Sequence, residues 1–215
     1  MASTQICQVS KFAGLEVTNL LGAIGQGLAV TLLRPDHRFV SSVVHSVHAS
    51  VTAYDSAADN SLFNAVVAAE DVRFERHSGL DFRAMCRALW FTLFRGHLQG
   101  ASTVEQQLVR VIRHRYELTL NRKVSEVILA LALSKQFEKA TIMEVYLELA
   151  YFGWRGNGIR QICDRLGLQP NSLRLEDAAL LAALIKLPMP KVKSEPYQTR
   201  LSRRVRHIRN MLGSK

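Results

Sequence analysis

The chain has 215 residues, of which 48% are hydrophobic and 21% charged, so it can bury a full core and is not an intrinsically disordered protein. Its formal net charge of +10 favours an anionic partner, such as a nucleic acid, an anionic lipid or a phosphorylated substrate. The three cysteines are too far apart in the sequence to indicate a disulfide framework or a zinc site.

The first predicted element is an uncharged run over residues 17–33, which contains three glycines and is bordered by Glu16. A membrane span needs roughly 20 mostly apolar residues, and this run is shorter and less apolar than that. We interpret residues 1–34 as a membrane-associated or weakly membrane-spanning segment, with a buried soluble helix as the alternative. Residues 35–215 are then the folded domain.

Beyond residue 60 the apolar residues recur at helical spacing, so the predicted fold is mainly α. Apolar stripes predict helices that include residues 82–93, 104–112, 124–131, 142–149 and 201–212, the last with an arginine-rich outer face. Residues 39–53 carry only a weak and mixed strand signal.

Two of the predicted helices carry further expectations. Cys86 falls on the apolar stripe of the first helix, so we expect a small core residue there rather than a nucleophile. Leu175 to Leu187 is apolar almost all round, which predicts a buried helix that ends before Pro188.

A polar stretch, AAEDVRFERHSGLD at residues 68–81, interrupts the apolar pattern. Glu70 directly follows five apolar residues, so its carboxylate is expected where the buried part of a helix meets the surface. A carboxylate in such a place is a candidate general base. The alternative is an ordinary helix end with solvated ion pairs.

A second polar stretch, GHLQGASTVEQQLVR at residues 96–110, leads from a glycine-flanked loop into a helix. Ser102 or Thr103 is a plausible N-cap, and a helix N-terminus with small hydroxyls can bind an anion. Gln106 and Gln107 add amides of the kind that bind sugar hydroxyls. Plain helix capping is the alternative.

The third stretch, NRKVSEV at residues 121–127, puts Lys123 and Glu126 three residues apart on one helix face, with Arg122 beside them. This arrangement suits a cation for a phosphate next to a second carboxylate. The alternative is a surface ion pair.

In order and spacing, these stretches resemble the family 51 glycosyltransferases, which are peptidoglycan glycosyltransferases. They occur as monofunctional enzymes and as the transglycosylase module of bifunctional penicillin-binding proteins. AAEDVRFERHSGLD is similar to the family's ED-x-x-F-x-x-H-x-G-x-D, GASTVEQQ to G-x-S-T-x-x-Q-Q, and RKVSE to R-K-x-x-E. IMEVYLELAYFGWRGNGI and LRLEDAALLAALIKLP resemble later family motifs. The chain looks like a monofunctional member.

The resemblance implies a lysozyme-like helical fold with two lobes around a long substrate groove. It also implies polymerisation of lipid II into β-1,4-linked glycan strands, with release of undecaprenyl pyrophosphate. By this resemblance, Glu70 is the base that takes the proton from the acceptor 4-hydroxyl, and the reaction inverts the donor anomeric carbon. Glu126 is the second essential carboxylate, near the donor pyrophosphate.

The remaining site residues implied by the resemblance bind or position the substrate. Arg122 and Lys123, assisted by Arg73, would neutralise the leaving pyrophosphate. The residues that would contact the glycan and phosphate are Ser102, Thr103, Gln106 and Gln107, and those that would shape the site are Asp71, Phe74 and His77.

The implied partners are lipid II and the growing glycan strand, the cytoplasmic membrane and other cell-wall synthases, with no nucleic acid. The implied location is the bacterial cytoplasmic (inner) membrane, with the catalytic domain on its periplasmic or outer face. No cofactor is firmly implied and no metal ligand is predicted, although a divalent cation, Mg or Mn, at Glu126 stays open as an alternative.

Three departures from the family pattern motivate a second hypothesis. Glu148 stands where the family's Y-L-N has Asn, Ser134 where it usually has Glu, and Arg160 opens a segment that is usually rich in alanine. The alternative is therefore a catalytically silent protein of the same fold that binds lipid II or acts as a cell-wall scaffold. A lytic muramidase is disfavoured because a hydrolase has no pyrophosphate to hold, and a nucleic-acid-binding protein would leave the motifs unexplained.

Overall fold

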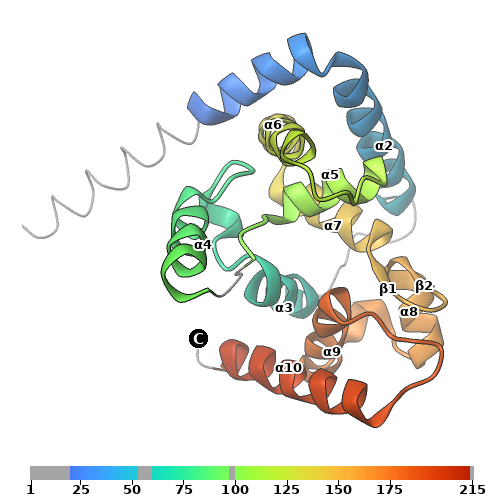
Figure 1. The fold of residues 1–215 in the computed structure, drawn as a ribbon. Coiled ribbons are helices and arrows are strands. Elements are labelled where there is room, and N and C mark those ends of the chain that lie inside the picture. Colours follow the sequence, from blue (N-terminus) through green and yellow to red (C-terminus); the bar gives the residue numbers. More distant parts are fainter. Residues whose placement is uncertain (1–19, 53–59, 97–99, 214–215) are drawn as a thin grey trace, which may run out of the picture. The chain divides into compact units, whose positions relative to one another are not determined.

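A computed structural model describes residues 20–52, 60–96 and 100–213, and this part of the chain is mainly helical, as predicted (Figure 1). Its contacts divide the chain into two compact units, each built from two separate segments. Unit 1 comprises the residues up to Ser42 together with Glu75–Ile142. Unit 2 comprises Val43–Phe74 and the residues from Met143 onward.

Three elements continue from one unit into the other along the chain. They are α2 (Arg34–Thr52), the short 3₁₀ turn η1 (Phe74–Arg76) and α7 (Lys139–Leu149). Residues 39–52, which carry only a weak strand signal, are helical as part of α2, because β-branched residues are tolerated in a helix that packs well.

Unit 1 is built around α5 (Val104–Arg113) and α6 (Leu120–Gln136), which pack against each other. Gly79 fixes the loop that runs beside them, because it has a φ of +85° and any Cβ there would lie 2.4 Å from the carbonyl oxygen of Ala130. Only glycine fits such a left-handed position pressed against a helix backbone. The loop that carries the first polar stretch is thereby held against α6.

Residues 20–32 are also helical and lie on unit 1. The glycine side of this helix faces α6, because a Cβ on Gly25 would lie 2.3 Å from the Cβ of Leu131. The same helix exposes other apolar residues, such as Ile24 and Leu28. No helix within the described residues is long and apolar enough to cross a membrane. The remainder of the predicted N-terminal segment, residues 1–19, lies outside the described residues.

The α4 helix (Phe82–Arg95) of unit 1 corrects two predictions. Its apolar stripe was expected to face the core, but Phe82 is 60% exposed and Leu93 68% exposed, and Cys86 is exposed as well. The buried side is instead formed by the small residue Ala88. Helical periodicity identifies an apolar face without saying which side of the helix packs.

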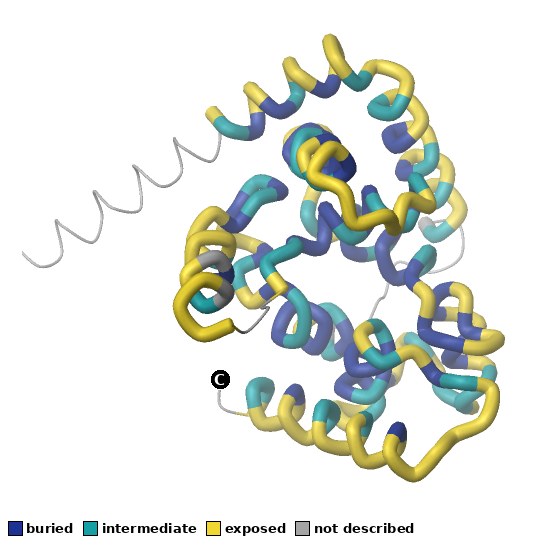
Figure 2. The backbone as a smooth tube through the Cα atoms, in the orientation of Figure 1, coloured by how far each residue is buried: buried dark blue, intermediate teal, exposed yellow. Residues whose placement is uncertain are grey.

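Unit 2 is built around α9 (Leu175–Lys186), which packs against α3 (Asn60–Glu70) and α10 (Glu195–Gly213). As predicted, α9 is a buried helix that ends before Pro188: its central part is buried and its ends are exposed, and the outer side of α10 is exposed as well (Figure 2). The remaining elements are α8 (Gly158–Leu166), the short turn η2 (Pro170–Ser172) and the hairpin of β1 (Tyr151–Gly153) and β2 (Gly156–Asn157).

Candidate active site

The N-terminus of α5 is fixed by two of the predicted site residues. Thr103 is the N-cap of the helix, and its hydroxyl accepts a hydrogen bond from the backbone N–H of Gln106 at 3.4 Å. The same hydroxyl donates to the carbonyl oxygen of Gly79 at 2.9 Å, and the Gln106 side-chain amide donates to that oxygen at 3.2 Å. Thr103 and Gln106 therefore join α5 to the loop of the first polar stretch.

Lys123 reaches from α6 to the same helix start. Its ammonium group donates to the hydroxyl oxygen of Ser102 at 2.9 Å and to the amide oxygen of Gln106 at 2.7 Å. Arg110 of α5 donates to the same Ser102 hydroxyl at 3.5 Å. The structure thus brings together residues that the sequence places about 20 positions apart along the chain.

Glu126 lies beside these cations and is only 1% exposed. One of its carboxylate oxygens is 2.6 Å from Nη2 of Arg110, and the other is 2.5 Å from Nη1 of Arg122. We call Arg110, Arg122, Lys123 and Glu126 the cation cluster. It holds three positive charges against one carboxylate, so an excess of positive charge remains for an anionic ligand.

The electrostatics of the cation cluster act on Lys123. Burial lowers the pKa of its ammonium group below the ordinary lysine value, the guanidinium groups of Arg110 and Arg122 act in the same direction, and the Glu126 carboxylate opposes them. A cation that is partly removed from water and crowded by like charges gains most when an anion arrives, because their attraction is weakly screened.

A divalent cation is not favoured at Glu126. Both carboxylate oxygens already lie against guanidinium groups, and a metal there would have to displace one of them. It would also stand among three positive charges. The residues at this position therefore fit an anion better than a metal.

The predicted base, Glu70, is the last residue of α3 in unit 2. Its carboxylate accepts a hydrogen bond from Arg204 of α10 at 2.7 Å, and the same guanidinium donates to the carbonyl oxygen of Ala69 at 3.3 Å. The Glu70 side chain is only 7% exposed. A buried carboxylate that is hydrogen-bonded to an arginine from another helix has a defined orientation, as a catalytic base requires.

The other residues of the first polar stretch divide between the units. Asp71, Arg73 and Phe74 belong to unit 2, where Asp71 and Phe74 are buried and Phe74 packs against Phe63 with ring centroids 6.0 Å apart. His77 belongs to unit 1 and is buried there, with its Nδ1 4.0 Å from a carboxylate oxygen of Glu105.

Gln107 and Glu105 complete the described surroundings in unit 1. Gln107 lies on α5 and is partly exposed. Glu105 is fully buried and forms an ion pair with Lys139. The burial of Glu105 was not predicted, because charged side chains are rarely buried and the sequence around Glu105 does not reveal its partner Lys139.

Sequence reasoning did not identify two arginines of the site. Arg110 could have been found, because it follows Gln106 by four residues on α5 and so lies on the same helix face. Arg204 could not, because it lies 134 positions from Glu70 among several other arginines of α10.

Two of the departures from the family pattern form a pair with each other. Nε of Arg160 donates to the Glu148 carboxylate at 2.9 Å in unit 2. The extra negative charge at the family's Asn position is therefore balanced by the extra positive charge of the following helix. Ser134, the third departure, is partly exposed on α6.

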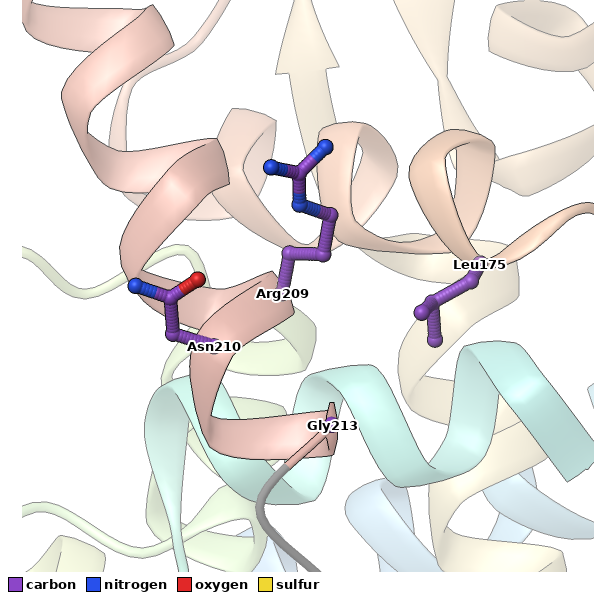
Figure 3. A pocket seen from close by; sticks show the side chains of 4 residues that line it. All are labelled: Leu175, Arg209, Asn210 and Gly213. Atoms are coloured by element: carbon purple, nitrogen blue, oxygen red, sulfur yellow. The ribbon is translucent and has the colours of Figure 1, made fainter.

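A depression on unit 2 is lined by none of the predicted site residues. Leu175 of α9 and Arg209, Asn210 and Gly213 of α10 line it (Figure 3). Arg209 is already paired with the Glu176 carboxylate at 3.1 Å. This depression marks the seam between two helices and offers no group for catalysis.

Comparison with known proteins agrees with this geometry. The family model described as Transglycosylase matches residues 36–212. The chain belongs to the transglycosylase family. This membership confirms the predicted family, the mainly helical fold and the class of enzyme, a glycosyltransferase of peptidoglycan synthesis.

Several relatives are named penicillin-binding protein 1A. The protein from Aquifex aeolicus is 37% identical over 156 residues, which cover 70% of this chain and 21% of the relative. The Escherichia coli K12 protein is 39% identical over 129 residues, or 59% of this chain and 15% of the relative. The Clostridium tetani protein is 29% identical over 183 residues, which cover 82% of this chain and 23% of the relative. This transglycosylase chain thus matches less than a quarter of the length of these relatives.

Proposed function

We propose that this transglycosylase polymerises lipid II into β-1,4-linked glycan strands, with inversion at the donor anomeric carbon and release of undecaprenyl pyrophosphate. The observation that carries the proposal is the cation cluster on α5 and α6, with three positive charges around one buried carboxylate. A hydrolase would have no use for this excess of positive charge, whereas a pyrophosphate leaving group requires it.

In this reaction Glu70 takes the proton from the acceptor 4-hydroxyl as that oxygen attacks the donor carbon. Arg204 fixes the direction of the Glu70 carboxylate through its hydrogen bond of 2.7 Å. The Glu70 carboxylate is therefore already oriented when the acceptor hydroxyl binds, which lowers the entropic part of the activation barrier.

The cation cluster stabilises the negative charge that develops on the leaving pyrophosphate. Lys123 is hydrogen-bonded to neutral oxygens of Ser102 and Gln106, and these two acceptors do not neutralise its positive charge. Arg110 and Arg122 are held in place by Glu126. In this proposal Glu126 therefore positions the two guanidinium groups through its ion pairs with them.

The scaffold alternative rested on departures from the family pattern, and the structure gives no specific observation in its favour. The ion pair between Glu148 and Arg160 accounts for two of these departures without involving the cation cluster. We therefore assign catalysis to residues 35–215 of the chain and membrane association to residues 1–34.

A membrane partner is supported by α4 of unit 1. Its exposed surface carries large apolar side chains, with Trp90 47% exposed and Phe94 70% exposed. Arg95 lies at the end of the same helix, and a cation next to exposed apolar side chains is attracted to the headgroups of an anionic membrane. This supports contact with the cytoplasmic membrane. We infer the outer or periplasmic face from the proposed reaction, because the glycan strand is needed there.

The test is polymerisation of labelled lipid II in detergent by the parent, Glu70→Gln and Glu75→Gln. Glu75 is an exposed carboxylate of the same polar stretch and serves as the matched control. We expect Glu70→Gln to lose at least about 10²-fold in rate, as for removal of a general base, and the control to keep the parent's rate. Circular dichroism of each variant checks that it is folded.

A near-normal rate for Glu70→Gln would refute the assignment of the base. A parent that binds lipid II but forms no lysozyme-digestible chains would instead favour the scaffold alternative.

A further inference from the structure

Three cations gather around one aromatic side chain at the tip of the β1–β2 hairpin, in unit 2. The Arg155 guanidinium lies 4.7 Å from the centroid of the Trp154 ring, that of Arg165 5.1 Å, and the Lys191 ammonium 5.8 Å. The Trp154 side chain is 37% exposed. We call these four residues the hairpin cluster; none of them was predicted as a site residue or lies in the cation cluster.

The backbone holds the hairpin cluster together from three parts of unit 2. The N–H of Trp154 donates to the carbonyl oxygen of Met189 at 2.8 Å, which brings the segment with Lys191 beside the hairpin. A Cβ on Gly153 would lie 2.2 Å from the Met189 nitrogen, so the two backbones touch. Arg165 arrives from α8 and donates to the Trp154 carbonyl oxygen.

Arg155 occupies an unfavourable backbone conformation. Its φ of 56° is in the left-handed region, where a side chain other than glycine, asparagine or aspartate is uncommon. Glycine would fit this turn without cost, yet the chain places a cation there. Strained positions of this kind concentrate where a side chain must point in a particular direction.

The charges of the hairpin cluster are not balanced by acids. Four other arginines of unit 2 pair with a carboxylate: Arg160 with Glu148, Arg174 with Asp177, Arg204 with Glu70 and Arg209 with Glu176. Across the part of the chain that the structure describes, no Asp or Glu forms an ion pair with Arg155, Arg165 or Lys191. The indole ring offsets part of their mutual repulsion, and an anionic ligand would offset more.

We propose that the hairpin cluster binds a carboxylate-bearing glycan strand outside the site of polymerisation. This inference rests on the proposed function, since the strand is the product of that reaction and its peptide stems carry carboxylates. An exposed hairpin tip suits an extended polymer, whose repeated charges make many weak contacts, better than a small ligand that needs an enclosed pocket.

A lipid surface fits the hairpin cluster less well. Insertion into a membrane requires a free apolar face. Here three cations already lie over the Trp154 ring, whereas the large exposed aromatic side chains of unit 1 gather on α4.

The test is co-sedimentation of the full chain with purified insoluble peptidoglycan. The double variant Arg155→Gly and Lys191→Gln removes two cations, and glycine suits the φ of 56° at the first position. The matched control, Arg203→Gln and Arg206→Gln, removes two exposed cations of α10 in the same unit. We expect about tenfold weaker binding for the double variant, and parental binding for the control.

A second measurement uses peptidoglycan whose carboxylates have been converted to amides. The parent should bind this material about tenfold more weakly, and the double variant should lose little further. Lys191→Gln alone, which leaves the turn unchanged, should show the same direction of effect if the double variant is unstable.

Three outcomes would overturn the proposal. They are equal binding by the double variant and the parent, an equal loss in the α10 control, and a double variant that loses binding to phosphatidylglycerol vesicles but not to peptidoglycan. Polymerisation of lipid II is measured separately. If the parent does not polymerise lipid II but binds peptidoglycan through the hairpin cluster, the proposed function alone is contradicted. If the parent polymerises lipid II but the variants bind peptidoglycan as tightly as the parent, this inference alone is contradicted.

Discussion

Lys123 is held between two neutral hydrogen-bond acceptors and close to two guanidinium groups, a placement that suits an anionic ligand and costs stability in its absence. Burial, followed by Arg110 and Arg122, lowers the pKa of its ammonium group in the folded protein relative to the unfolded chain. The charged form is therefore disfavoured by folding. This cost is present in full below the folded-state pKa and is relieved as the pH rises through that value toward 10.5.

The substitution Lys123→Gln tests this trade. Between the lowered folded-state pKa and 10.5 the unfolded parent holds more protons at this site than the folded parent, so the stability of the parent should rise with pH relative to that of the variant. Thermal unfolding of both proteins across this range measures the difference. A difference that does not change with pH would contradict the account.

At neutral pH we expect the Lys123→Gln variant to polymerise lipid II at least about 10²-fold more slowly than the parent, because the leaving pyrophosphate loses a cation.

The residue scale also shows what the sequence could and could not reveal. Ser102, Gln106, Arg122, Lys123 and Glu126 come together in unit 1, because the two motifs that contain them lie on helices that pack against each other. Their roles toward the substrate stay predictions. The partner of Glu70 was not predictable, because no local pattern distinguishes Arg204 from the other arginines of α10. Such a pair becomes visible only when two distant helices pack.

At the scale of elements, the start of α5 carries both the fold and the site of unit 1. The Thr103 hydroxyl accepts from the helix N-terminus and donates to the Gly79 carbonyl oxygen, so one side chain satisfies groups of two elements. The sequence predicted a cap at Ser102 or Thr103, and Thr103 is confirmed in that role. Its second bond depends on the glycine loop against α6, which capping rules do not include.

Substitution of Thr103 should therefore cost more than the loss of an ordinary cap. We expect Thr103→Ala to lower the free energy of unfolding by about 2 kcal/mol, the upper part of the range for N-caps, because a buried carbonyl also loses a donor. Urea unfolding measures the loss. Thr103→Ser keeps the hydroxyl and should recover most of it, and equal losses for the two variants would show that the methyl group rather than the hydroxyl matters.

The α4 helix shows the limit of periodicity at the same scale. Its apolar stripe was found correctly, but its direction was not, because Phe82, Met85 and Leu93 are exposed and Ala88 is buried. An apolar stripe that stays exposed is a candidate for contact with another surface. The sequence shows that α4 has an apolar stripe, but it does not show whether this stripe faces the core or the solvent.

At the scale of the whole molecule, positive charge and exposed apolar surface both favour an anionic membrane. The net charge of +10 attracts such a surface, and the exposed side of α4 offers side chains that can enter it. Electrostatic attraction weakens with salt, whereas apolar insertion does not, so the two contributions can be separated by experiment.

The double variant Leu93→Ser and Phe94→Ser should bind phosphatidylglycerol vesicles about tenfold more weakly than the parent, because two side chains that are 68% and 70% exposed no longer insert. The matched control, Leu175→Ser and Val192→Ser, removes two exposed apolar side chains of unit 2 and should keep the parent's binding. Vesicle flotation at low and high salt measures both effects. If the control lost as much as the α4 variant, binding would reflect exposed apolar area in general. If neither lost affinity while salt abolished it, charge alone would hold the protein at the membrane and α4 would need another partner.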